Sequence, residues 1–383
     1  MLCFSVESIS AACHIKRVFD TGYALPVAGN FGQMVHATLL CDVLQMERKE
    51  DRRSCMGMNQ VKVSVIMPMY NVSRVIKRAI ESLYAQTLSG IELVFVDDCS
   101  KDDTLDTLKA LLPQKEGVQV KIVRHTENRG VAVARNTGLE HATGEYIYYV
   151  DADDYIEPNT LDKLYSKAQE RDADIVGCEW FLTFEKNERY MKQADVTTGN
   201  ELFIKMAHGV MRWNLWLFLV KRSLYERNGF RFIEGMNMGE DMMVMMKLAL
   251  HAHRVEMIHE PLYHYIQTNS ASLTKNFKAY RYQVTVNVNA VEEYLKIQGR
   301  NDLGNALMQL KLTLKLPLLI SDKVENYEIW YQWFPEANNA VKANKDLPWR
   351  TRLIQLVASK RQFWILKLYY KLVIKLVYGI IYK

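Results

Sequence analysis

The chain has 383 residues, of which 49% are hydrophobic and 24% charged, enough for a large domain with a buried core and additional helices. Its formal net charge of +5 is too small to indicate a nucleic-acid-binding protein, so no nucleic-acid partner is predicted. Lysine or arginine interrupts the longest apolar stretches, and the sequence therefore predicts no transmembrane helix.

The cysteines indicate neither a zinc site nor a disulfide framework. They are Cys3, Cys13, Cys41, Cys55, Cys99 and Cys178. No two of them form a C-x-x-C pair, and four lie within the first 55 residues. Because the N-terminus also lacks the basic and apolar regions of a secretory signal, we expect a reducing, cytoplasmic setting.

The first 60 residues differ from the rest of the chain. They show no sustained periodicity and end in a charged run at 47–53. We expect the native chain to start at Met56 or Met58, with the preceding segment an over-extended reading frame or a disordered leader. The sequence then divides into a poorly structured extension at 1–60, a main domain at 61–270, a helical extension at 271–345 and a basic amphipathic tail at 346–383.

From Val61 to Cys178, short β-branched runs alternate with helical segments. The predicted strands are Val63–Met67, Glu92–Val96, Val118–Val123 and Tyr146–Val150. Helices are expected after each of the first three, one capped by Asn71, one opened by residues 100–103 and one near 130–142. This alternation predicts an α/β fold with a doubly wound, mostly parallel sheet flanked by helices. Residues 179–270 are more mixed, and 276–345 are largely helical.

Polar side chains follow three of the predicted strands where each strand ends. The segments are Pro68–Asn71, Asp97–Ser100 and Asp151–Asp154. Because ligands bind at the carboxyl ends of parallel strands, we expect these side chains to share one cleft. Several carboxylates in one cleft repel each other, so Mg²⁺ or Mn²⁺ and nucleotide hydrogen-bond donors are their natural partners.

The order and spacing of these motifs resemble the family 2 glycosyltransferases of the GT-A fold. The resemblance covers roughly 61–270 and includes Val63–Ile66, Tyr70-Asn71, Val96–Asp98, Asn128–Gly130, Ala134–Asn136 and Asp151–Asp154. It implies an inverting enzyme that moves one sugar from a nucleotide-diphosphate sugar, by family habit a UDP-sugar, to an acceptor hydroxyl. It also implies a role in bacterial surface polysaccharide or glycolipid synthesis.

The resemblance assigns the nucleotide to the ends of the first two strands. Pro68 and Tyr70 would lie beside the base, Asp98 would form a hydrogen bond to it, and Asn128 would shape the loop that closes on the nucleotide. Tyr70 has the alternative of packing at the rim, and Asp97 fits a turn or helix-capping role as well as a ligand contact.

The resemblance assigns the donor sugar, the metal and the base to a second group. Arg135 would point at the donor, Asp151 would contact the ribose or donor sugar, and Asp153 would bind Mg²⁺ or Mn²⁺. Asp241 would be the catalytic base, with Glu240 steering neighbouring contacts. The alternative for Arg135 is a solvated surface cation. The alternative for Glu240 and Asp241 is ordinary capping of a helix.

The acceptor side is less defined. Trp213 and Trp216 fit stacking on a sugar or filling the core equally well. His264 fits a surface or core histidine, with approach to the diphosphate as the alternative. In the resembled family, the enzymes that polymerise sugars carry a Gln-x-x-Arg-Trp motif after the base. Because no such motif follows Asp241 here, a single transfer is favoured over polymerisation.

The tail is basic and amphipathic. From Trp349 to Lys383 there are eight lysines or arginines and no acidic residue, and Lys367, Lys371 and Lys375 recur on one helical face. This pattern predicts peripheral contact with anionic lipid at the inner face of the cell membrane, and a saccharide or lipid-linked saccharide as acceptor. The alternative is a terminal helix that packs on the protein itself.

Two other functions share this kind of fold. A nucleotidyltransferase needs a glycine-rich phosphate loop after the first strand, which Pro68–Asn71 is not. A non-catalytic sugar-binding protein is disfavoured because all the carboxylates are present.

Overall fold

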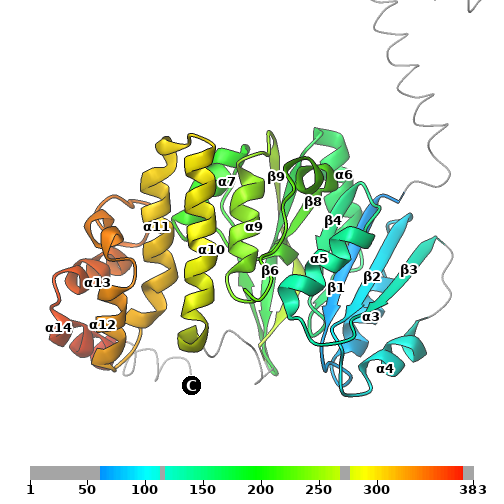
Figure 1. The fold of residues 1–383 in the computed structure, drawn as a ribbon, viewed down its shortest axis with the longest axis horizontal. Coiled ribbons are helices and arrows are strands. Elements are labelled where there is room, and N and C mark those ends of the chain that lie inside the picture. Colours follow the sequence, from blue (N-terminus) through cyan, green and yellow to red (C-terminus); the bar gives the residue numbers. More distant parts are fainter. Residues whose placement is uncertain (1–60, 113–116, 268–276, 374–383) are drawn as a thin grey trace, which may run out of the picture. The chain divides into compact units, whose positions relative to one another are not determined.

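The computed structural model describes residues 61–112, 117–267 and 277–373, and it confirms the predicted fold class. A mixed, mostly parallel sheet is flanked by helices, and further helices follow it in the chain (Figure 1). The predictions for residues 1–60, including the start of the chain and four of the cysteines, lie outside the described residues. Cys99 and Cys178 are free and buried.

The first half is a parallel β-α unit repeated along the chain. Its elements are β1 (Val63–Met69), α3 (Ile76–Tyr84), β2 (Ile91–Asp97), α4 (Thr104–Leu111), β3 (Val118–Arg124), α5 (Val131–His141) and β4 (Tyr146–Tyr149). Strands β1, β2 and β4 are buried nearly throughout because helices cover both faces of the sheet. Strand β3 is half exposed, as expected at the edge of the sheet.

The second half adds five strands to this sheet, and β5, β7 and β8 pair antiparallel with their neighbours. They are β5 (Tyr155–Ile156), β6 (Ile175–Thr183), β7 (Glu188–Met191), β8 (Phe218–Lys221) and β9 (Val255–Ile266). The strand order is β3-β2-β1-β4-β8-β6-β9-β5, with β7 paired to β6. Strand β8 runs antiparallel to both β4 and β6, whereas β6 and β9 are parallel.

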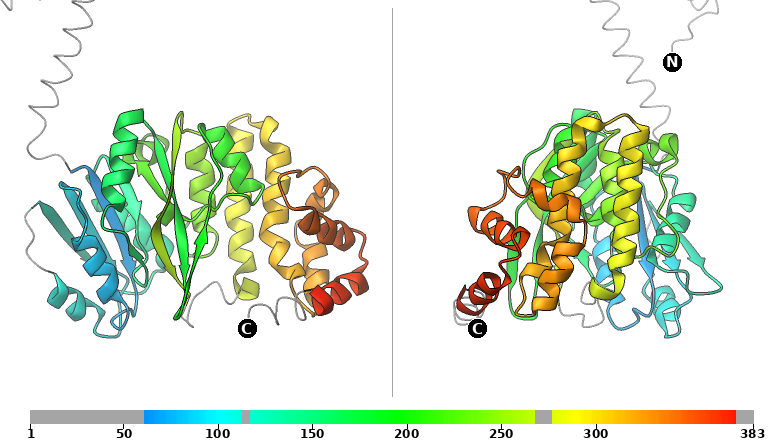
Figure 2. Two further views of the ribbon diagram at one scale, coloured as in Figure 1. Left: turned by 180° about the vertical axis from the view of Figure 1, so that it is seen from behind. Right: turned by 60° about the vertical axis from the view of Figure 1, so that its left-hand side comes forward.

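Helices α5 and α9 lie in front of the sheet in Figure 1, and Figure 2 shows the molecule from behind. The helices of this half are α6 (Thr160–Arg171), α7 (Gly199–Ala207), α8 (Arg222–Asn228) and α9 (Glu240–Ala249), with a 3₁₀ turn at Leu215–Leu217. Helix α5 packs so closely on β1 that a Cβ at Gly138 would lie 2.3 Å from Ile66. This close contact fixes α5, which carries Arg135, against the carboxyl half of the sheet.

The region after 276 is helical. It contains α10 (Phe277–Ile297), α11 (Gly304–Lys315), α12 (Val324–Gln332), α13 (Trp349–Ser359) and α14 (Phe363–Tyr369), with 3₁₀ turns at Asn301–Leu303, Leu316–Leu319 and Pro335–Ala340. In the part of the chain that the structure describes, no helix is both long and apolar enough to cross a bilayer.

The predicted capping of the first helix by Asn71 is wrong. Helix α3 begins only at Ile76, and no side chain caps it. Asn71 instead adopts a left-handed φ of 54°, and its Oδ1 accepts a hydrogen bond from the Lys101 amide at 2.7 Å. The asparagine therefore joins two strand ends, a long-range contact that a local capping pattern does not reveal.

Candidate active site

The carboxyl ends of β1 and β2 are joined by hydrogen bonds between their loops. The Asp98 amide donates to the Met69 carbonyl at 2.9 Å, and the Asn71 amide donates to Ser100 Oγ at 3.0 Å. Pro68 lies within β1, partly exposed, and Tyr70 follows with 45% of its surface exposed. Tyr70 is thus available to a planar ligand at this rim, although its contact with a base stays a prediction.

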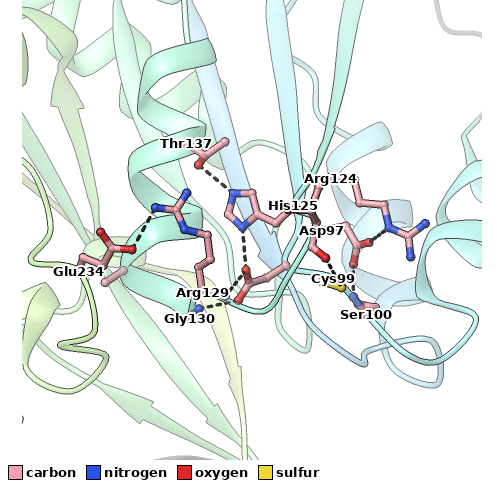
Figure 3. A network of polar contacts seen from close by, with 12 residues as sticks. Asp97, Cys99, Ser100, Arg124, His125, Arg129, Gly130, Thr137 and Glu234 are labelled. Atoms are coloured by element: carbon pink, nitrogen blue, oxygen red, sulfur yellow. Dashed lines mark hydrogen bonds and ion pairs between the residues drawn. The ribbon is translucent and has the colours of Figure 1, made fainter.

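Asp98 is buried and organises the loop before α5. Its Oδ2 accepts the Gly130 amide at 2.7 Å, and its Oδ1 accepts the Arg129 amide at 2.9 Å and contacts His125 Nδ1 at 2.7 Å. The other nitrogen of His125 lies 2.9 Å from Thr137 Oγ1, and Figure 3 shows the imidazole between Thr137 and this loop. Asp98 therefore positions the loop at Arg129 and Gly130; its direct contact with a base stays a prediction.

Asp97 has the turn role, because both of its oxygens are engaged by residues of neighbouring loops and strands. Its Oδ1 accepts the Ser100 amide at 3.1 Å, and its Oδ2 lies 3.1 Å from Arg124 Nε. Asn128, by contrast, is exposed on the loop that Asp98 holds.

The acidic loop after β4 divides into buried and accessible carboxylates. Asp154 is fully buried, where it accepts the Ile266 amide at 2.8 Å and the Tyr263 hydroxyl at 2.7 Å. The Asp151 amide donates to the same Tyr263 hydroxyl at 3.2 Å. Asp154 and Tyr263 thus fasten the loop to β9, while Asp151 and Asp153 are partly exposed.

Arg135 is the centre of the site. Its Nη1 donates to Asp241 Oδ1 at 2.5 Å and to Glu240 Oε1 at 2.7 Å, and its Nη2 lies 3.5 Å from Asp151 Oδ1. The side chain is buried, which excludes a solvated arginine. One guanidinium therefore brings the loop after β4 and the start of α9 to the same point.

These carboxylates perturb each other's protonation. Burial raises the pKa of Asp151 to about 6, with Asp153 and Asp241 adding to the rise and Arg135 opposing it. Burial and Asp241 raise the pKa of Glu240 to about 7, again against Arg135. Burial lowers the pKa of Arg135, but Asp241, Glu240 and Asp151 outweigh it and the net pKa is raised. The arginine stays charged and is outnumbered by carboxylates.

The loop before α9 is hydrogen-bonded to α5, and this fixes the position of the start of α9. Asn237 Oδ1 accepts the Ala132 amide at 3.0 Å, and Asn136 exchanges two hydrogen bonds of 2.9 Å with the backbone of Phe232. Gly130, with φ of 86°, lies so close that a Cβ there would be 2.3 Å from the Asn237 side chain. We did not predict His125, Thr137 or Asn237 from the sequence; Asn136 lay in a quoted motif but had no assigned role.

Asp241 has one well-engaged and one weakly engaged oxygen. Its Oδ1 accepts from Arg135, whereas its Oδ2 has a hydrogen bond of 3.4 Å from the Leu215 amide. The residues before Leu215 therefore lie next to the acidic pair. Trp213 is partly buried there, while Trp216 is buried and stacks on Tyr263 at 4.2 Å, so Trp216 belongs to the core.

His264 contacts residues outside the cluster around Arg135. Its two ring nitrogens lie 2.8 Å from Glu157 Oε1 and 2.9 Å from Glu188 Oε1, and its ring stacks on Tyr155. Both nitrogens are therefore engaged by carboxylates, which does not favour contact with a diphosphate.

The acidic loop fits a divalent cation. No three ligating side chains gather into a metal cluster within 61–112, 117–267 and 277–373. Mg²⁺ is nevertheless usually held by one or two carboxylates together with waters and phosphate oxygens. Asp151 and Asp153, partly exposed on the loop after β4, are such a donor set.

Comparisons with known proteins show the family of this chain. The family model for glycosyl transferase family 2 matches residues 64–239. The glycosyltransferase GlyG of Streptococcus pneumoniae serotype 4 is 30% identical over 233 residues, which are 56% of this chain and 74% of GlyG. The chain belongs to glycosyl transferase family 2. This membership excludes the nucleotidyltransferase alternative and makes the chain a glycosyltransferase.

Two further likenesses bear on the transferase. The uncharacterized glycosyltransferase EpsJ of Bacillus subtilis is 34% identical over 220 residues, and the match spans 56% of this chain but only 63% of EpsJ. S. aureus TarS superimposes with a TM-score of 0.56 at 20% identity, over 81% of this chain and 55% of TarS. Its fragment 1–349 in complex with UDP-GlcNAc gives 0.51 at 19% identity, over 79% and 92%. At these identities the structures establish the fold alone.

The raised pKa of Glu240 predicts a pH-dependent stability. A carboxyl group whose pKa rises from its ordinary value near 4.5 to about 7 stabilises the fold below the lower value and loses that contribution as pH rises through the higher one. We expect the melting temperature of the transferase to fall between about pH 5 and about pH 8. Glu240→Gln should flatten this fall in scanning calorimetry, and an unchanged slope would show that Glu240 does not cause it.

Proposed function

We propose that the transferase moves a single sugar from a UDP-sugar to an acceptor hydroxyl with inversion at the anomeric carbon. The observation that carries the proposal is the contact of Arg135 with both Asp151 and Asp241, because it brings a donor loop and a candidate base together. The fold shared with the TarS fragment in complex with UDP-GlcNAc supports a uridine nucleotide as donor.

The chemistry assigned to this chain is a single displacement. Asp241 Oδ2, which has only a long bond from Leu215, takes the proton of the acceptor hydroxyl as that oxygen bonds to the anomeric carbon. The bond from the anomeric carbon to the nucleoside diphosphate breaks, and its electron pair leaves with the diphosphate. Arg135 keeps Asp241 Oδ1 occupied and so orients the carboxylate.

The remaining residues bind the donor. Tyr70 and Pro68 would border the base, the loop at Asn128 and Gly130 would close on the nucleotide, and Asp151 would contact the ribose or donor sugar. Mg²⁺ or Mn²⁺, held by Asp153 together with the diphosphate, would supply positive charge for the leaving group.

The setting we propose is the cytoplasmic face of a bacterial cell membrane. A saccharide or lipid-linked saccharide would be the acceptor, in the synthesis of a surface polysaccharide or glycolipid. The likeness to GlyG, a bacterial glycosyltransferase, supports a bacterial cell, and the basic C-terminal helices support contact with a membrane.

The metal assignment predicts a large effect on donor binding. Mutation of residues that merely support metal ligands costs 10- to 100-fold in affinity, so Asp153→Asn should weaken Mn²⁺-dependent UDP-sugar binding at least about tenfold. Titration calorimetry of a UDP-sugar panel with Mn²⁺ or EDTA measures this. Asp172→Asn, an equal charge change at an exposed left-handed position, is the matched control. Equal donor affinity in the two variants would place the metal elsewhere.

A further inference from the structure

The two helices after Pro348 expose one apolar face each. Trp349 and Leu353 lie one turn apart on α13, with Trp349 67% exposed. Trp364, Leu368 and Leu372 recur every four residues along α14 and the turn that follows, with Trp364 71% exposed. Side chains at this spacing share a helix face. Two tryptophans and three leucines therefore point to solvent from neighbouring helices.

The opposite faces of the same helices pack on the protein. Ile354 and Ala358 of α13 and Phe363 and Leu366 of α14 are buried, and Phe363 contacts the Tyr327 ring of α12. The tail is thus not a free helix: it packs on the protein through one side, which was the alternative to lipid contact, and presents the other. A groove of about 260 Å³ between Val341 and α13, bordered by Lys342 and Arg352, adjoins the exposed side.

The exposed side is basic. No acidic residue occurs from Trp349 to the end of the chain. Of the acidic side chains on adjoining elements, Glu328 pairs with Arg361 at 2.8 Å and Asp346 with His208 at 2.8 Å, while Asp322 and Glu325 are exposed beside and on α12. The six lysines and arginines of 349–373 outnumber these four carboxylates.

We propose that α13 and α14 form an interfacial surface that docks on a bilayer containing anionic lipid, with Trp349 and Trp364 at the level of the headgroups. Lys367 and Lys371 alternate with Leu368 and Leu372 along α14. Lysine is depleted in protein–protein interfaces. In an interfacial helix, by contrast, its stem lies along apolar surface while the ammonium reaches anionic headgroups. The composition of this face thus favours a bilayer over a second protein.

Helix α14 lies toward the same edge of the molecule as α4. Helices α14 and α4 lie toward the lower edge of Figure 1. They do so in Figure 2 as well, whose views are turned about the vertical axis. Helix α4 follows the carboxyl end of β2, where Asp98 lies. Helix α14 and the carboxyl end of β2 thus lie toward the same edge of the molecule.

The test is flotation of the full chain with vesicles of phosphatidylcholine plus phosphatidylglycerol, and with phosphatidylcholine alone. No nucleotide-sugar is present, so the result is independent of the proposed transfer reaction. We expect binding to the anionic vesicles. Trp364→Glu with Leu368→Glu should abolish it, and Lys367→Gln with Lys371→Gln should weaken it about thirtyfold. Ile297→Glu, at an exposed apolar position on α10, is the matched control and should bind normally.

Thermal unfolding verifies that each variant is folded. Equal binding to the two kinds of vesicle, or normal binding by the Trp364/Leu368 variant, would overturn the proposal. So would a wild-type dimer that ignores vesicles and dissociates on the same substitutions, because the face would then cover a second copy of the chain.

Discussion

Asp241→Asn is expected to lower kcat for sugar transfer by about 10²- to 10⁴-fold, the range contributed by a positioned general base. The amide keeps the shape of the carboxylate, and its single oxygen can still accept from Arg135, but it lacks the basicity to take the acceptor proton. Because Asp241 is the base and not a donor ligand in this account, the affinity for UDP-sugar with Mn²⁺ should change little. Steady-state kinetics and titration calorimetry on the same preparation separate the two quantities.

The matched control for this substitution is Asp195→Asn, which makes the same change at an exposed carboxylate. It should leave both kcat and donor affinity unchanged. Transfer by Asp241→Asn at the rate of the control would mean that another group takes the proton. A joint loss of donor binding and transfer would instead make Asp241 part of the donor site.

Arg135→Met is expected to destabilise the fold by about 3–5 kcal/mol at neutral pH, because it leaves buried carboxylates without their cation. Asp151, Glu240 and Asp241 would then face each other with no positive charge between them. Transfer should be lost as well, since Asp241 Oδ1 would no longer be held. Chemical denaturation at fixed pH measures the stability and a donor-turnover assay the activity.

A second substitution distinguishes charge from packing. Glu240→Gln in the Arg135→Met background removes one of the repelling carboxylates, and should recover part of the lost stability without recovering transfer. Arg171→Met, at an exposed arginine on α6, should cost less than about 0.5 kcal/mol. If Glu240→Gln brought no recovery, the loss would reflect a packing defect around the missing guanidinium rather than unbalanced charge.

Local sequence was sufficient for the parts of the site that follow strands directly. The apolar run before Asp151 predicted a buried strand with an acidic loop after it, and the run before Asp97 did the same for β2. Parallel pairing of β1 with β2 and with β4 brings these loops to one edge, so their common location followed from the fold class. The resemblance, rather than the pattern, supplied the individual roles.

The contacts that orient Asp241 could not be predicted from local sequence patterns. Asn237 caps α5 from 105 residues further along the chain, and Arg135 reaches Asp241 across 106. Nothing in the segments themselves specifies these pairs, because each residue type also fits a turn or the surface. The same limit applied to Asp98 and Asn71. Asp98 accepts hydrogen bonds from the loop at Gly130, and Asn71 accepts one from the Lys101 amide.

The tail shows a different limit. Its periodicity predicted one amphipathic helix, but the structure has two, separated by a turn in which Arg361 adopts φ of 56°. A helix with one apolar stripe and a basic stripe fits both packing on the protein and contact with lipid. The described residues show that α14 has apolar side chains for the first role and others left exposed, while Lys375 and Leu376 lie outside them.

The most direct test of the central claim is a crystal structure with a UDP-sugar and Mn²⁺ bound. The account predicts an Asp153 oxygen about 2 Å from the metal beside the diphosphate. It also predicts Asp241 Oδ2 across the anomeric carbon from the leaving group, with room for one acceptor oxygen between them. A donor seated away from Asp153, or with Asp241 on the same side of the sugar as the diphosphate, would contradict it.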